Sequence, residues 1–130
     1  MPYMKMHHEE DPKQTLLKEL GDLSNIEIFN NQLLLAIYVR PKKTKSGIML
    51  ADQTTQEDLY QSKVGLIVKV GPTAFHDDSG KWFKGMKLEM HDWVVFRPSD
   101  SWSINVHGVP CRLIDDIFIR GKLEAPDQVW

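Results

Sequence analysis

Apolar and polar residues follow two different patterns along this chain, and the change falls near residue 25. From there on, short runs rich in Val, Ile and Leu are separated by Gly, Pro and Asn, which is typical of β-strands joined by turns. We expect strands at seven places: 25–29, 32–40, 64–70, 88–96, 103–106, 110–114 and 117–120. Many short strands of this kind predict an all-β fold, either a small barrel or a sandwich.

Residues 1–24 form an N-terminal extension with a helical pattern in its second half. The leucines share one helical face and stand at Leu16, Leu17, Leu20 and Leu23. Asp11 is suited to cap this helix, Pro12 to begin it and Gly21 to end it. A helix of about ten residues is too short to be stable alone in water, so it must pack on another part of the protein or fray. We therefore divide the chain into this extension and a barrel domain, residues 25–130.

A long polar segment, residues 41–63, interrupts the strand pattern. Three consecutive apolar residues, Ile48, Met49 and Leu50, follow Gly47 near its middle and fit neither a strand nor a helix period. Leaving each of these side chains in water forgoes about 1.5–3 kcal/mol of burial free energy. They either fold back on the barrel or bind an apolar groove of a partner protein, and the pattern alone does not separate these alternatives.

Composition argues against several classes of function. The net charge of −2 gives no reason to expect binding to nucleic acid or membranes. The one cysteine, Cys111, lies in a predicted strand, and the five histidines lack metal-site spacing, so we expect no metal, no cofactor and no catalytic residues. No signal peptide or membrane-spanning run is recognisable, and we expect a cytoplasmic protein.

The order of the motifs resembles the GroES co-chaperonins from about Asn25 to Glu124. The most specific stretch is Thr-Lys-Ser-Gly-Ile-Met-Leu at 44–50, and Val70-Gly71 after the next strand also matches. Further matching stretches are Gln32–Leu35, Gly65–Pro72, Lys87–Phe96 and Ile114–Ile119. The resemblance implies a small irregular β-barrel with a mobile loop at 41–63 and a roof hairpin at 73–86.

The same resemblance implies a function. Members of the family form rings, usually heptamers, that cap a GroEL-type chaperonin and enclose an unfolded client protein, while ATP is bound by the chaperonin. Carried over to this chain, the chaperonin-binding residues are Gly47, Ile48, Met49 and Leu50. The subunit interface pairs the first strand with the last strand of a neighbour, through Ile26, Ile28, Phe29, Ile117, Phe118 and Ile119.

The sequence also departs from the family pattern. Only one glycine precedes the tripeptide, His91 replaces a turn glycine, and the N-terminal extension has no usual counterpart. A histidine is acceptable at that turn, since it adopts positive φ more readily than most residues. These departures suggest a divergent, bacteriophage-encoded member that acts in the host cytoplasm. The alternative is a structural or virion interaction protein that reuses the GroES-like barrel.

Overall fold

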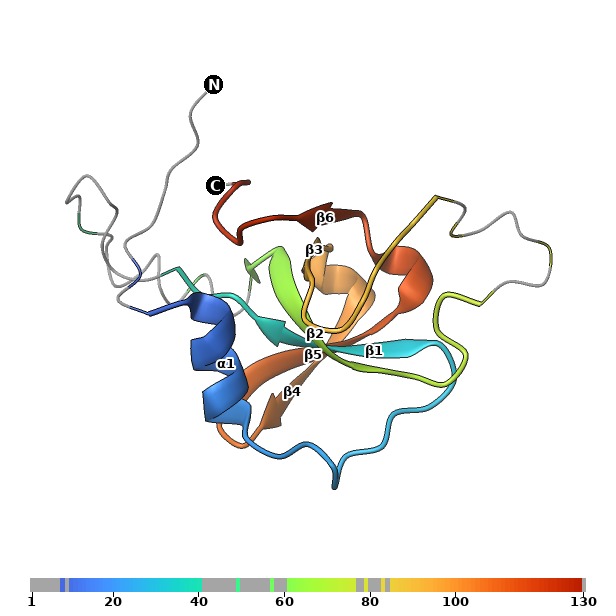
Figure 1. Ribbon diagram of the computed structural model, residues 1–130, viewed down its shortest axis with the longest axis horizontal. Helices are drawn as coiled ribbons and strands as arrows, with labels where there is room; N and C mark the ends of the chain where they lie inside the picture. Colours follow the sequence, from blue (N-terminus) through green and yellow to red (C-terminus); the bar gives the residue numbers. More distant parts are fainter. Residues whose placement is uncertain are drawn as a thin grey trace.

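The fold is described by a computed structural model that covers residues 8, 10–40, 49, 57, 61–76, 79, 83 and 85–129. Most of the predicted mobile loop and much of the predicted roof hairpin lie outside these residues. Six antiparallel strands form one sheet in the order β4-β5-β1-β2-β3-β6 (Figure 1). They are β1 (Gln32–Ile37), β2 (Val64–Val70), β3 (Trp93–Val95), β4 (Ser101–Val106), β5 (Val109–Asp115) and β6 (Gly121–Leu123). The predicted all-β class is confirmed.

The sheet curls so that its two edge strands approach each other. Asp100 directly precedes β4 and Arg120 directly precedes β6, and their side chains form an ion pair at 3.9 Å. Strands β4 and β6 are nevertheless the two ends of the strand order, so each has one edge without a partner strand among the described residues. A curled sheet with two edges left open agrees with the small irregular barrel predicted from the sequence.

Both faces of the sheet are apolar, and β1 is buried on both of them. Alternate residues of a strand point to opposite faces, so Leu33 and Leu35 belong to one core cluster and Leu34 and Ala36 to the other. The cluster around Leu34, which we call the helix-side core, also contains Trp93 and Cys111. The cluster around Leu33, the opposite core, contains Phe96 and Ile114 among others.

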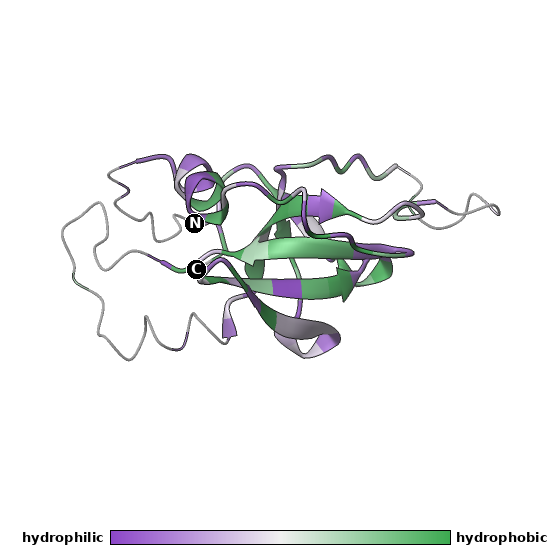
Figure 2. Ribbon diagram, turned by 90° about the horizontal axis from the view of Figure 1, so that it is seen from below, coloured by the Kyte–Doolittle hydropathy of each residue, from purple (hydrophilic) through white to green (hydrophobic). Residues whose placement is uncertain are grey.

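The N-terminal helix α1 (Pro12–Leu20) covers part of the helix-side core. As predicted, the Asp11 side chain caps it by accepting a hydrogen bond from Lys13 N, Pro12 begins it and Gly21 ends it. Leu20 is only 1% exposed, and Leu16 and Leu17 pack against the same cluster. Figure 2 shows the helix beside the sheet. The extension is therefore docked on the barrel.

Three predicted strands differ from the observed ones. Residues 25–29 form no strand: the chain turns at residues 24–25, and Lys69 Nζ donates a hydrogen bond to the carbonyl of Ile26. The predicted strand at 88–96 shrinks to β3, since residues 90–91 form a turn. The last predicted strand, 117–120, is replaced by a 3-10 turn, η2 (Asp116–Phe118), followed by β6.

Two turns and one close contact explain sequence features noted above. His91 has φ 72°, so histidine does occupy the left-handed position that glycine takes in related proteins. His107 and Gly108 both have positive φ and join β4 to β5 in a two-residue hairpin, as expected. Gly71 lies against three carbonyl oxygens; a Cβ there would overlap the oxygen of Asn30 and lie 2.9 Å from that of Gln32. Only glycine fits after β2.

Candidate functional site

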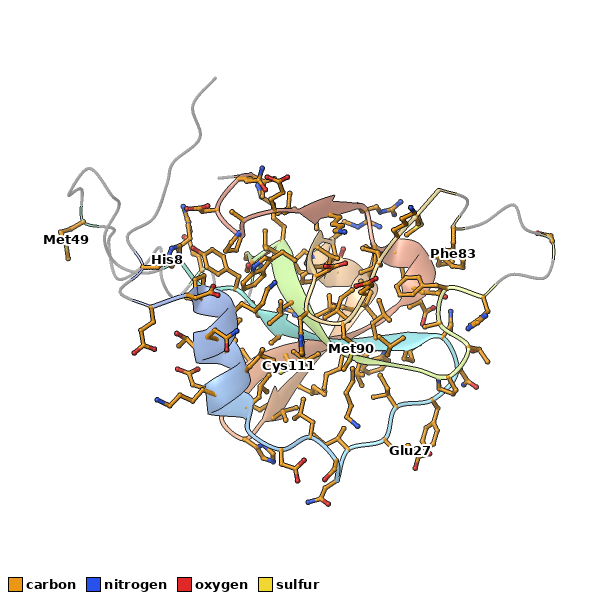
Figure 3. The ribbon with its side chains drawn as sticks, in the orientation of Figure 1. His8, Glu27, Met49, Phe83, Met90 and Cys111 are labelled. Carbon is orange, nitrogen blue, oxygen red and sulfur yellow. The ribbon has the colours of Figure 1, made fainter. Side chains whose placement is uncertain are left out.

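The predicted chaperonin-binding residues are represented in the described part of the chain by Met49. Its side chain is 64% exposed, and Figure 3 shows it well outside the sheet. Gly47, Ile48 and Leu50 lie outside the described residues, so their role stays a prediction. The exposure of Met49 is what a binding residue needs before its partner arrives.

The chain on either side of this segment is held together by hydrogen bonds. Tyr38 follows β1, and its backbone N donates to the carbonyl of Val64 at 3.0 Å. Ser62, 2% exposed, donates from Oγ to the Tyr38 carbonyl at 2.6 Å. The ring of Tyr38 packs edge-on against Trp93, with centroids 5.6 Å apart. Tyr38, before the 41–63 segment, is therefore fixed to Ser62 and Val64 at its other end, and we call these three residues the loop base.

The predicted interface residues of the first segment lie on the surface of the helix-side core. Ile26 and Ile28 are half-buried and pack against that cluster, whereas Phe29 is 63% exposed. Because this segment belongs to no strand, its backbone groups are not used in the sheet of its own subunit. Within the subunit, Ile26 N donates to the carbonyl of Leu23, and the carbonyl of Phe29 accepts a hydrogen bond from Gln32 N. Pairing of this segment with a strand from another chain stays a prediction.

The predicted interface residues of the last segment differ from one another in exposure. Ile117 is 42% exposed and Phe118 is half-buried, but Ile119 is 8% exposed and belongs to the opposite core. In this segment, therefore, the side chain of Ile117 is exposed, whereas those of Phe118 and Ile119 pack against the opposite core. Any contact that Ile119 makes with a neighbour would have to use its backbone.

The buried carboxylate of Asp116 connects three turns of the barrel, a role that the sequence pattern did not indicate. Asp116, 2% exposed, accepts hydrogen bonds from Asn31 Nδ2 at 3.0 Å and from Phe75 N at 2.7 Å. Its own backbone N donates to the carbonyl of Asn31. Three separate turns are thereby fixed to one another, so Asp116 is a structural residue.

Other chemically capable side chains are engaged in structural contacts. Cys111 is buried in the helix-side core, and this burial raises the pKa of its thiol to about 12. His107 Nδ1 donates to the carbonyl of Leu20 at 2.5 Å, and His8 Nε2 is hydrogen-bonded to the Tyr38 hydroxyl at 2.8 Å. Within the described ranges, no group of three or more His, Cys, Asp and Glu residues is arranged to hold a metal ion. No described helix is long and apolar enough to cross a membrane.

Comparison with known proteins agrees with these features. No curated protein sequence matches the chain significantly. The family model described as chaperonin 10 Kd subunit matches residues 25–123, which includes all six strands and the segment between β1 and β2. Members of this family are co-chaperonins: they assist protein folding as oligomeric rings together with a GroEL-type chaperonin, and in general they are not enzymes. The chain thus belongs to the chaperonin 10 Kd subunit family, the GroES-like co-chaperonins.

Proposed function

We propose that this protein caps a GroEL-type chaperonin ring by inserting its 41–63 segment into apolar grooves on that ring. The residues that make the contact are Gly47, Ile48, Met49 and Leu50. The observation that carries the proposal is the apolar tripeptide inside a polar segment. This segment joins β1 to β2 and lies within the residues that match the family model. ATP belongs to the chaperonin, and the client protein is enclosed between ring and cap, in the cytoplasm.

The loop base supports this role. Because hydrogen bonds between Tyr38, Ser62 and Val64 close the barrel beneath the segment, movement or binding of the segment need not disturb the sheet. Each docked tripeptide buries side chains worth about 1.5–3 kcal/mol apiece, from which the entropy of ordering the segment is subtracted. A single copy should therefore bind weakly, and several copies in one ring should bind tightly through avidity.

Ring formation is proposed to use residues 25–29 of one subunit against residues 117–122 of the next. The first segment is outside the sheet of its own subunit, and the outer edge of β6 has no partner among the described strands. Figure 1 places the chain that leads from α1 to β1 and strand β6 on opposite sides of the molecule. Two different surfaces on opposite sides give a head-to-tail contact, which forms a closed ring when the rotation between successive subunits returns to the first one; we expect a heptamer.

The docking role is tested with the double variant Ile48→Ser, Leu50→Ser. The matched control is Gln53→Ser, Thr55→Ser, which changes two polar residues of the same segment. We expect the first variant to lose binding to an immobilised GroEL-type ring in the presence of nucleotide, and the control to bind normally. Circular dichroism should show the same fold in both. Normal binding by the first variant would refute the docking role.

The ring is tested independently by native mass spectrometry of the free protein. We expect a particle of seven times the subunit mass of 15.0 kDa. The variant Phe29→Asp places a charge on the exposed one of the three predicted interface residues in the first segment and should shift the population to monomers. A wild-type protein that remains monomeric at every concentration would contradict the proposed ring.

A further inference from the structure

A groove with an apolar floor lies between helix α1 and the barrel, apart from the tripeptide. Its volume is about 550 Å³. Its apolar lining includes Leu16 of the helix, Ile37 and Val39 from the end of β1 and the residues after it, and Val109 and Pro110 from the start of β5. A cavity of this size is in the range that receives several side chains of a ligand or partner.

The charged groups that line this groove within the described residues are acidic. Glu10 precedes the helix and Glu19 lies near its end, and both are exposed. The two lysines of α1, Lys13 and Lys18, do not line the groove. His8 also borders it, but its ring nitrogen is hydrogen-bonded to Tyr38. The groove therefore suits an apolar segment that carries lysine or arginine.

The groove lies next to the loop base. Tyr38 and Val39 line it, and two residues later the chain enters the segment that carries the tripeptide. Figure 3 shows His8 and Met49 on the same side of the molecule. Any partner held by the tripeptide would approach this side of the barrel. Helix α1 is outside the part of the chain that matches the family, so this surface is an addition to the shared barrel.

We propose that the groove is a second binding surface for the chaperonin, which takes a basic and apolar segment of that protein beside the tripeptide site. This inference rests on the proposed function and deepens it. The tripeptide supplies the contact common to the family, and Glu10 and Glu19 select chaperonins that present a complementary positive charge. Charge pairs at the rim of an interface contribute chiefly to specificity and association rate.

The test compares two variants with the same change of net charge. Glu10→Gln with Glu19→Gln removes the acidic rim, and Glu89→Gln with Glu124→Gln removes two exposed carboxylates that do not line the groove. Affinity for a GroEL-type ring with nucleotide is measured at low and high salt. We expect the rim variant to bind about three- to tenfold more weakly at low salt, a difference that shrinks at high salt because exposed charges are screened. The control should bind as the wild type does.

A second readout locates the contact directly. Carbodiimide activation of the bound complex should join Glu19 to a lysine of the chaperonin, and mass spectrometry of the peptides identifies the pair. Equal affinity of the rim variant and the wild type at both salt concentrations would overturn the inference, while loss of binding in the tripeptide variant would still support the proposed function. If the rim variant changed the mass of the free ring instead, the groove would be a contact between copies of this chain, and the inference would be wrong.

Discussion

The two faces of the sheet are covered in different ways. The opposite core is closed by residues inside the family match, from the turn after β2 to the segment before β6. The helix-side core is covered in part by α1, which the family match does not include. Leu20 of the helix is as deeply buried as Leu33 of the opposite core, at 1% and 0% exposed. The extension is therefore part of the hydrophobic core in this protein, and the shared barrel alone would leave apolar side chains exposed.

Deleting residues 1–21 should have the largest effect on this comparison. It removes the burial of Leu16, Leu17 and Leu20, which contribute about 1.5–3 kcal/mol each. We expect a fall of several kcal/mol in the free energy of unfolding, measured with urea, and binding of a hydrophobic dye. Deleting only residues 1–7 is the control and should change neither. Equal stability of the two truncated proteins would mean that α1 is a dispensable covering.

The thiol of Cys111 offers a second measurement of the same deletion. Burial raises its pKa from 9.0 to about 12, so at pH 8 the thiol of the intact protein is neutral and should react slowly with alkylating reagents. The deletion should accelerate alkylation. Because the folded-state pKa is the higher one, the stability linked to the neutral thiol is complete below pH 9 and is lost as the pH rises toward 12.

The variants Leu20→Ala and Leu33→Ala compare the two cores one side chain at a time. Each removes a fully buried leucine, and such truncations cost about 2–5 kcal/mol. We expect both variants to lower the free energy of unfolding by similar amounts, measured with urea. Leu23→Ala is the control for general effects near the helix, because Leu23 is only partly buried. A much smaller loss for Leu20→Ala would show that the helix-side core tolerates exposure.

The variant Asp116→Ala tests how the opposite core is closed. It leaves Asn31 Nδ2 and Phe75 N without this acceptor; a fully buried unsatisfied donor costs about 1–3 kcal/mol, and these half-buried donors should each cost less. Asp116→Asn keeps one acceptor oxygen and should lower the free energy of unfolding by less than Asp116→Ala does. Compared with the wild type, amide hydrogen exchange should be faster near Phe75 and unchanged in β4. Uniform acceleration across the sheet would argue against a local closing role.

The smallest effect is expected for His107→Ala. This change removes the hydrogen bond to the carbonyl of Leu20 at the end of α1, and a single such bond contributes about 0.5–1.5 kcal/mol. The melting temperature should fall slightly, and amide exchange in α1 should increase while that in β1 does not. Identical exchange in the helix would indicate that leucine packing alone holds it.

The features that sequence predicted well are those whose signals are local. Asp11, Pro12 and Gly21 mark the ends of α1. The binding role of Ile48, Met49 and Leu50 stays a prediction, since it depends on a partner protein that a local pattern does not identify. The strand at 25–29 was wrong for the isolated subunit, because alternation of apolar residues does not tell whether a partner strand is available. Asp116 was not recognised as a structural centre, since its partners lie 85 and 41 residues away in the chain.

The loop base limits the distance between the barrel and the tripeptide. Both ends of the segment leave the barrel at one point, so the shorter arm sets how far the tripeptide can travel. Ile48 stands eight residues after Arg40, and a fully extended chain of that length spans at most about 26–29 Å. A subunit whose tripeptide is engaged is thus kept within roughly 30 Å of the surface that holds it, however the two proteins rotate.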